Sequence, residues 1–272
     1  MAAAEQEMSQ PSRIEQAAIL CGGRGTRLGA LAAGTPKPLL PVGGRPFLEL
    51  LLGRLRLSGI RRVLLLAGFA ADRILDYIAA NAIERRFGIS VEVAIEPFPA
   101  GTGGALWHAR HALDEQFFLL NGDSWFDMSL AKLAERLAIE PAAIGVLALR
   151  RLDDTGRYGT VAVSGDSIVR FAERPARPTA GLINGGIYTF RRSLLDHLRE
   201  CCSLEGDALP PLARAGALRG IVFDGYFIDI GVPEDLARAE RELPKAAHAL
   251  VGRAARRRRA PPQGRRLNAV LK

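Results

Sequence analysis

The sequence predicts an α/β protein whose mixed, mostly parallel sheet is flanked by helices. Two observations lead to this fold class. First, short apolar runs alternate along the chain with amphipathic stretches of helical length, which is typical of strand–helix–strand units. Second, the first apolar run leads directly into a glycine-rich turn, as a strand at the ligand-binding edge of such a sheet often does. The 272 residues, 48% of them hydrophobic, suffice for a substantial core.

The first half of the chain supplies the strands and helices of the expected core. Apolar runs predict strands at residues 17–20, 62–67, 90–95, 117–120 and 143–149. Between them, apolar residues recur at helical spacing and predict helices at residues 47–57, 71–80, 104–113 and 130–137.

After Arg150 the expected strands become shorter and turns more frequent. Strands are predicted at residues 159–163, 168–172, 186–190 and 220–223, as an extension of the core sheet rather than a separate domain. A last helix is predicted at residues 233–243, because a proline stands in its first turn with acidic residues beside it. The sequence contains no internal repeat.

The charge distribution divides the chain into three parts. The net charge is +8, but residues 253–272 hold eight basic residues and no acidic one, which leaves 29 basic and 29 acidic residues elsewhere. We therefore expect a polar N-terminal extension (1–15), one folded domain (16–245) and a basic tail (246–272) that is disordered. The neutral domain and the lack of aromatic residues in the tail argue against a specific nucleic-acid partner.

The sequence predicts a cytoplasmic protein. It has no run of about 18 apolar residues that would span a membrane, and its N-terminus does not resemble a signal peptide. Three cysteines, two of them adjacent (Cys201 and Cys202), form a poor disulfide framework and suggest a reducing compartment.

The segment 17–42 carries the strongest functional signal. Its glycine-rich turn, CGGRGTRL, follows the first predicted strand, and glycines allow backbone N–H groups to approach phosphate oxygens. Arg24 and Lys37 add positive charge for a phosphorylated ligand. Pro36 and Pro38 are expected to hold the backbone of Lys37 extended and so to aim its side chain. The segment predicts a site for a nucleotide and a second phosphate.

Two familiar phosphate-binding motifs are excluded. The dinucleotide pattern G-x-G-x-x-G requires a third glycine where Leu28 stands, and the phosphate loop G-x-x-x-x-G-K-[S/T] is absent because no Gly-Lys pair occurs. An ordinary turn that touches no phosphate remains the alternative for a glycine-rich turn taken alone.

Further motifs stand at the ends of predicted strands, where open α/β sheets bind ligands. Gly101 and Thr102 lie in the loop 96–104, which is expected to turn N–H groups toward a base or phosphate, unless it is an ordinary turn before a helix. Asp123 ends a buried strand in Asn121-Gly122-Asp123 and is a candidate Mg²⁺ ligand or else a turn aspartate.

The second half of the chain adds polar residues in two kinds of motif. Glu173 and Asn184 offer a carboxylate and an amide, which suit sugar hydroxyls. Asp229 has hydrophobic neighbours on both sides and is a candidate second ligand of the metal of Asp123. Sequence spacing does not show whether these two aspartates converge.

In this order, the motifs GGRGTRL, PKP, GTGG, NGD, ERP, NGGIY and FIDIG resemble those of the sugar-1-phosphate nucleotidyltransferases, over roughly residues 16–242. Within that family the segments LCGGRGTRL, LNGDSWFD and FIDIGVPED are most similar to the D-glycero-α-D-manno-heptose 1-phosphate guanylyltransferases. The resemblance implies a Rossmann-like, nucleotidyltransferase (GT-A-like) fold without the β-helix domain of larger relatives.

The resemblance also implies roles for individual residues. It assigns catalysis to Arg24, Lys37 and Asp123, and the metal, Mg²⁺, to Asp123 and Asp229. It assigns the nucleotide to Leu20, Gly22, Gly23, Gly25, Thr26, Gly101 and Thr102. It assigns the sugar to Asn121, Glu173 and Asn184.

The implied reaction transfers a nucleotidyl group from an NTP to a sugar 1-phosphate and releases pyrophosphate. The resemblance favours GTP as the donor and D-glycero-α-D-manno-heptose 1-phosphate as the acceptor. No Ser/His or Cys/His dyad is needed, because the acceptor phosphate is already largely ionised at neutral pH, with a second pKa of about 6.

The alternative functions are a mannose-1-phosphate guanylyltransferase, a muramate-1-phosphate uridylyltransferase, or a catalytically silent regulatory subunit. A homo-oligomer is a further expectation.

Overall fold

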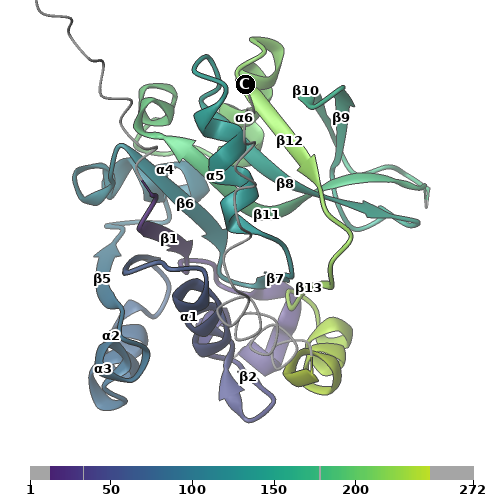
Figure 1. Cartoon of the computed structure of the whole chain (residues 1–272). Helices are drawn as coiled ribbons and strands as arrows, with labels where there is room; N and C mark the ends of the chain where they lie inside the picture. Colours follow the sequence, from purple (N-terminus) through teal and green to yellow (C-terminus); the bar gives the residue numbers. More distant parts are fainter. Residues whose placement is uncertain (1–12, 33, 178, 246–272) are drawn as a thin grey trace, which may run out of the picture.

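A mixed nine-stranded sheet runs through the computed structural model, which describes residues 13–32, 34–177 and 179–245 (Figure 1). Its strands lie in the order β5-β4-β1-β6-β11-β8-β12-β10-β9. In chain order they are β1 (Gln16–Leu20), β4 (Arg62–Ala67), β5 (Ser90–Ile95), β6 (Gln116–Asn121), β8 (Gly145–Leu152), β9 (Thr160–Ser164), β10 (Ser167–Ala172), β11 (Gly181–Arg191) and β12 (Leu218–Val222).

Strands at one end of this sheet pair only in parallel, whereas the other end is mixed and has β12 parallel to β8 among antiparallel pairs. Strands β5, β4, β1 and β6 pair in parallel, whereas β11 is antiparallel to both β6 and β8. Parallel strands end at one edge of a sheet, so the loops after β1, β4 and β6 gather there. The prediction of a mixed sheet flanked by helices is confirmed, and the strands after Arg150 extend the same sheet as predicted.

Helices cover both faces of the sheet and enclose two apolar clusters. On one face lie α1 (Phe47–Leu57), α2 (Ala71–Ala80), α3 (Ile83–Phe87), α5 (Leu130–Ala138) and the helix at 233–245. On the other lie α4 (Gly101–His108), α6 (Leu209–Arg214), the 3₁₀ turn η4 (Arg192–His197) and the π-turn η5 (Leu204–Ala208). The described chain contains no β-helix, and no described helix is long and apolar enough to cross a membrane.

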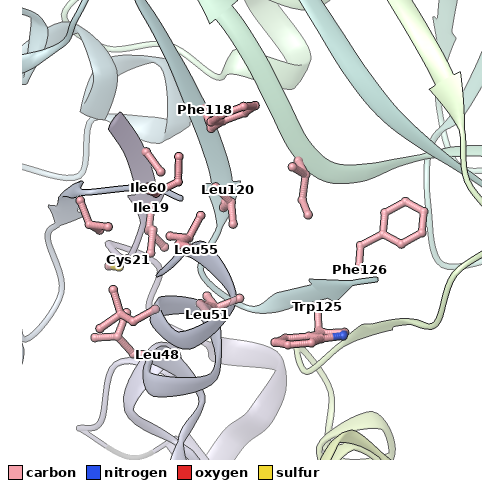
Figure 2. Close-up of a cluster of buried hydrophobic side chains, with 14 of the residues drawn as sticks. Ile19, Cys21, Leu48, Leu51, Leu55, Ile60, Phe118, Leu120, Trp125 and Phe126 are labelled. Atoms are coloured by element: carbon pink, nitrogen blue, oxygen red, sulfur yellow. The ribbon is translucent and has the colours of Figure 1, made fainter. Parts of the chain in front are cut away.

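The packing of α1 shows why the first half of the sequence folds as expected. Leu48, Leu51 and Leu55 recur every three or four residues and are fully buried on one face of α1. They meet the alternate residues of β1 and β6 that point the same way, including Ile19 and Leu120 (Figure 2). The helical period of 3.6 residues and the strand period of 2 residues therefore bring these side chains together in one core.

Several elements differ from the sequence predictions. Helix α4 starts at Gly101 and ends at His108, because residues 110–112 tighten into a 3₁₀ turn before β6. Strand β11 is much longer than the predicted 186–190. Two short ribbons were not predicted: β2 (Pro41–Val42) with β3 (Arg45–Pro46), and β7 (Ser124–Phe126) with β13 (Phe227–Asp229). The second ribbon contains Asp229 and begins directly after Asp123, the other candidate metal ligand.

The predicted extension at 1–15 and tail at 246–272 fall almost wholly outside the described residues. Gln16 opens β1, and the helix that begins at residue 233 is described as far as residue 245. The assignment of 16–245 to one domain stays a prediction.

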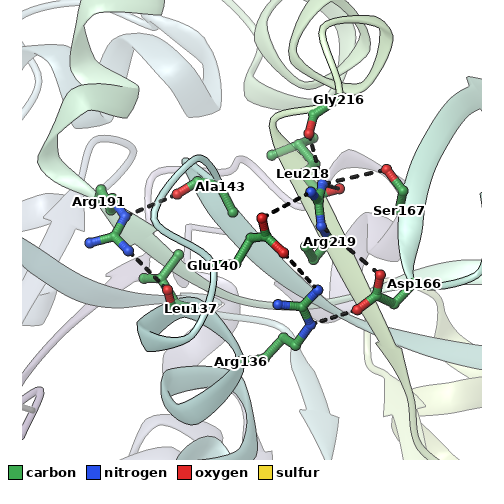
Figure 3. Close-up of polar contacts among 10 residues, drawn as sticks. All are labelled: Arg136, Leu137, Glu140, Ala143, Asp166, Ser167, Arg191, Gly216, Leu218 and Arg219. Carbon is green, nitrogen blue, oxygen red and sulfur yellow. Dashed lines mark hydrogen bonds and ion pairs between the residues drawn. The ribbon is translucent and has the colours of Figure 1, made fainter.

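A network of ion pairs fastens the end of α5 to the antiparallel part of the sheet (Figure 3). Arg136 contacts Asp166 at 2.5 Å and Glu140 at 3.1 Å, and Arg219 contacts Glu140 at 3.5 Å. The Arg136 guanidinium holds the pKa of Asp166 below its usual value. The network lies away from the predicted site residues and so serves stability.

We expect Arg136→Gln to lower the free energy of unfolding by about 1 kcal/mol at neutral pH, since partly exposed ion pairs contribute little each. A lowered folded-state pKa of Asp166 stabilises the protein above the unfolded-state pKa, and that contribution disappears as pH falls through the folded-state pKa. Urea unfolding at neutral and acidic pH measures both effects. An equal difference between wild type and variant at both pH values would contradict this account.

Candidate active site

A cavity of about 600 Å³ opens at the carboxyl ends of β1, β4 and β6. This is where an open α/β sheet places its ligands, and the volume suits a ligand of nucleotide size. The glycine turn after β1, the loop 96–102 and the end of β6 form its walls. Nine of the predicted site residues line it: Leu20, Gly22, Gly23, Arg24, Lys37, Gly101, Thr102, Asn121 and Asp123.

The glycine turn presents free backbone donors. Gly23 and Arg24 are exposed, and within the described chain their N–H groups donate to no protein acceptor. Gly25 has φ +65°, which disfavours any residue with a Cβ, and a Cβ there would stand 3.2 Å from Cγ of Lys37. Gly25 and Thr26 do not line the cavity, so Gly25 shapes the turn and makes room for Lys37.

Lys37 forms the charged centre of the cavity with Asp123. Its Nζ lies 2.5 Å from Oδ2 of Asp123, and both side chains are about four-fifths buried (15% and 21% exposed). The expectation of an extended backbone at Lys37 is wrong: Pro36 is extended, but Lys37 begins the 3₁₀ turn η2 (Lys37–Leu39). Pro38 tolerates this turn because its first residues need no N–H donor.

Asp123 and Asp229 are brought together by the ribbon of β7 and β13. Asp229 pairs with Ser124, and the N–H of Ile230 donates to the carbonyl of Asp123 at 2.8 Å. Burial and the neighbouring Asp123 carboxylate raise the pKa of Asp229, although the N–H of Gly231, at 2.6 Å from Oδ1, favours its charged form. Two carboxylates are therefore held side by side at a cost.

This pair fits a divalent cation. A cation removes the repulsion between the two carboxylates, and Mg²⁺ is commonly held by one or two carboxylates together with substrate phosphates. The described residues contain no group of three or more acidic, histidine or cysteine ligands, so substrate oxygens and water would complete the coordination. Asp123 and Asp229 would hold the ion.

The first turn of α4 uses part of its backbone to bind protein rather than ligand. The N–H groups of Gly103 and Gly104 both donate to the carbonyl of Cys202 at 3.0 Å. These two N–H groups are therefore not available to a base or phosphate, and the contact predicted for Gly101 stays a prediction. Thr102 Oγ1 donates to Glu205 at 2.6 Å and accepts from the N–H of Leu204 at 2.8 Å. Thr102 thus holds Glu205 at the cavity wall.

Glu96 is a cavity residue that the sequence motifs did not single out. Its carboxylate lies against the backbone of Gly22 and Gly68, where a Cβ on Gly68 would collide with it. It accepts from the N–H of Ala100 at 3.2 Å, and burial raises its pKa. No local pattern marks it, because its position depends on close contact between two loops.

Arg27, like Glu96, is a residue near the site to which the sequence motifs assign no role. A Cβ on Gly231 would stand 2.7 Å from Oδ1 of Asp229 and 3.3 Å from Nη2 of Arg27. The guanidinium therefore lies beside the turn that holds Asp229. The only sequence signal was its place in the glycine-rich turn.

The predicted sugar residues are dispersed. Asn121 lines the cavity, and its Oδ1 is buried with no partner among the described residues, which leaves an acceptor for a ligand. Asn184 instead donates to the hydroxyl of Tyr188 at 2.7 Å and accepts from the N–H of Gly186 at 3.1 Å. Glu173 is exposed at the end of β10, and neither it nor Asn184 lines the cavity.

Cys21 lies in the glycine turn but is not a nucleophile. It is fully buried, and burial together with the charge of Asp123 raises the pKa of its thiol. The thiolate is the reactive form, so Cys21 fills space between β1 and α1 (Figure 2).

Free backbone donors, a lysine and two adjacent carboxylates at one edge of a mixed sheet define an enzyme that acts on nucleoside phosphates. Comparison with known sequences agrees: a model of the nucleotidyl transferases matches residues 16–246. The chain belongs to the Nucleotidyl transferase family, and it is a nucleotidyltransferase. The resemblance inferred from the motifs is confirmed.

Curated relatives match nearly their whole length. The D-glycero-alpha-D-manno-heptose 1-phosphate guanylyltransferase of Campylobacter jejuni is 38% identical over 81% of this chain and 96% of its own. The enzyme of that name from Aneurinibacillus thermoaerophilus is 36% identical over 84% of this chain and 98% of its own.

A solved structure shares the fold. HddC from Yersinia pseudotuberculosis, complexed with GMP-PN, superposes with a TM-score of 0.74 at 30% identity. The match covers 85% of this chain and 100% of HddC. The predicted nucleotidyltransferase fold is thereby confirmed.

Proposed function

We propose that the protein transfers a guanylyl group from GTP to D-glycero-α-D-manno-heptose 1-phosphate and releases pyrophosphate, to make a nucleotide sugar for surface polysaccharide. The observation that carries the proposal is the convergence of Lys37, Asp123 and Asp229 beside a cavity of nucleotide size. The names of the Campylobacter and Aneurinibacillus relatives and the GMP-PN bound to HddC support the choice of guanine and heptose.

The chemistry requires charge and orientation rather than a general base. An oxygen of the acceptor phosphate, already ionised, forms a bond to the α-phosphorus of GTP while the bond to pyrophosphate breaks on the opposite side. The free N–H groups of Gly23 and Arg24 bind the leaving phosphates, and Lys37 reduces the repulsion between the two anions. Bound Mg²⁺, the ion we propose for the aspartate pair, supplies further positive charge.

Glu96 accounts for a preference for guanine. A carboxylate only accepts hydrogen bonds, and the Watson–Crick edge of guanine offers two adjacent donors, its ring N1–H and its exocyclic amine. Adenine offers an acceptor at N1 instead. We propose that Glu96, at the cavity wall next to Gly22 and Gly68, accepts from this guanine edge.

Glu96→Gln is expected to lower kcat/KM for GTP by about 10- to 100-fold, the effect of one charged hydrogen bond, and to leave any turnover of ATP unchanged. Because burial raises the pKa of Glu96, its carboxylate should become protonated at a higher pH than an ordinary glutamate. As pH falls, the KM for GTP in the wild type should therefore begin to rise at a correspondingly higher pH. Glu92→Gln, on the exposed side of β5, is the matched control. Unchanged GTP kinetics in Glu96→Gln would contradict this role.

Experiment can distinguish the rival functions from the proposed one. A mannose-1-phosphate guanylyltransferase keeps the same mechanism, and a muramate-1-phosphate uridylyltransferase changes the base. A silent regulatory subunit is disfavoured, because Lys37, Asp123 and Asp229 are all present and adjacent. A cytoplasmic location is part of the proposal, supported by the free thiols of all three cysteines. The homo-oligomer stays a prediction.

A further inference from the structure

Glu205 is a carboxylate in the cavity of the glycine turn that takes no part in the proposed mechanism. It lies in the π-turn η5 and lines the cavity, and its side chain is half-buried. π-turns are rare and often occur at functional sites. Glu205 is therefore a candidate for contact with a substrate, although no sequence motif singled it out.

The two carboxylate oxygens of Glu205 differ in their contacts. Oε2 accepts from the hydroxyl of Thr102 at 2.6 Å and from the hydroxyl of Ser203 at 3.5 Å. Within the described chain, Oε1 accepts only from the hydroxyl of Tyr188, also at 3.5 Å, and a hydrogen bond of this length is weak. Oε2 is therefore occupied by protein, whereas Oε1 keeps the capacity to accept from a ligand.

Thr102 fixes the orientation of this carboxylate. Its Oγ1 accepts from the N–H of Leu204 at 2.8 Å, and its own hydroxyl proton goes to Oε2 of Glu205. Thr102 and Ala105, which are three residues apart on one side of α4, both line the cavity. The start of α4 and Glu205 thus form one wall of the cavity, in which the carboxylate is held in place.

The ligand group that meets Oε1 must be a hydrogen-bond donor without negative charge. A carboxylate only accepts hydrogen bonds, and its charge repels phosphate groups. The described residues contain no group of three acidic, histidine or cysteine ligands, so Glu205 does not join Asp123 and Asp229 around the ion. If Glu96 binds the guanine edge, the hydroxyls of the ribose are the donors of GTP that remain.

We propose that Oε1 of Glu205 accepts a hydrogen bond from the ribose diol of the donor nucleotide and thereby selects nucleotides with a complete ribose. The inference rests on the proposed function, which places a nucleoside triphosphate in this cavity. A partly buried acceptor that loses its donor is costly, so a nucleotide without the hydroxyls is disfavoured. Acidic side chains bind ribose in this way at other open α/β sheets. Glu205 is then a specificity-determining residue, separate from Lys37 and the metal carboxylates.

The test compares GTP with 2′,3′-dideoxy-GTP in the wild type and in Glu205→Gln. The hydroxyl of Thr102 still needs an acceptor, so the amide oxygen of the glutamine takes the place of Oε2 and its NH₂ group replaces the free oxygen. In the variant, kcat/KM for GTP should fall about 10- to 100-fold, as expected when one charged hydrogen bond is lost. The value for 2′,3′-dideoxy-GTP and the KM for the acceptor should stay unchanged. An equal loss with both nucleotides, or unchanged GTP kinetics, would overturn the proposal.

Variants of Thr102 provide a second route if Glu205→Gln fails to fold. Thr102→Val removes the hydroxyl that anchors Glu205 and should reduce the preference for GTP over 2′,3′-dideoxy-GTP. Thr102→Ser keeps the hydroxyl and should keep the preference, so equal preferences in the two variants would contradict the proposal. Glu200→Gln, an exposed position close in sequence, is the matched control and should respond as the wild type does.

A binding measurement separates this proposal from the proposed function. If the wild type releases no pyrophosphate with GTP and the heptose phosphate, the dissociation constants of GTP and 2′,3′-dideoxy-GTP replace kcat/KM. A loss of affinity for GTP alone in Glu205→Gln would then keep the ribose contact and refute the proposed function. Turnover without a loss specific to GTP would refute the ribose contact alone. A wild type that binds no GTP would overturn both.

Discussion

Lys37→Ala is expected to lower kcat by about 10²- to 10³-fold, the usual result of removing a preorganised charge from a developing anion. Nζ of Lys37 lies in the cavity beside Asp123 and is largely buried, so its charge is weakly screened. In the proposed mechanism, the substitution removes a cation at the point where the two phosphate groups approach each other.

Steady-state kinetics with GTP and the heptose phosphate measure the effect, with thermal unfolding as the check on folding. Lys132→Ala removes an exposed lysine of α5 and is the matched control. A Lys37→Ala protein that folds and turns over at a rate close to wild type would rule out a catalytic role for this lysine.

Asp229→Asn is expected to have opposite effects on stability without and with Mg²⁺. Burial and Asp123 raise the pKa of Asp229, so its ionised form destabilises the folded state. The stability of the metal-free wild type should therefore fall as pH rises from the unfolded-state pKa through the folded-state pKa. The variant should escape this loss and unfold at a higher temperature than the metal-free wild type at neutral pH.

With Mg²⁺ the order should reverse. A cation that binds only the folded state raises the stability of the wild type by mass action, whereas Asp229→Asn and Asp123→Asn should gain little and lose most activity. Asp224→Asn, whose carboxylate is 94% exposed, is the control and should respond to Mg²⁺ as the wild type does. An Mg²⁺-dependent gain in Asp229→Asn equal to that of the wild type would contradict a shared metal.

The parts of the fold that sequence predicted are those with a long local pattern. Helices α1 and α2 and strands β4 and β5 have the predicted bounds, because apolar spacing and turn residues agree there. The ribbon of β7 and β13 escaped prediction because each strand has three residues and is defined only by a partner about 100 residues away. Long-range pairing, not local propensity, creates it.

The candidate site likewise contains residues that the sequence predicted and residues that it did not. The glycine turn, Lys37 and Asp123 were found because they lie in compact motifs next to a strand end. Glu96 was missed because tertiary contacts alone place its carboxylate in the cavity. Thr102 was predicted to bind the nucleotide, but its hydroxyl is engaged by Glu205 and the backbone of Leu204, a use that no sequence pattern indicates.

Pyrophosphate release with Mg²⁺ tests the central claim most directly. The assay crosses GTP, ATP, CTP, UTP and dTTP with the 1-phosphates of manno-heptose, mannose, glucose and muramate. The proposed function predicts the fastest release with GTP and the manno-heptose 1-phosphate. Release with another pair would keep the mechanism and replace the substrates. No release from any pair, in a protein that still binds nucleotide, would contradict catalysis and favour the silent regulatory subunit.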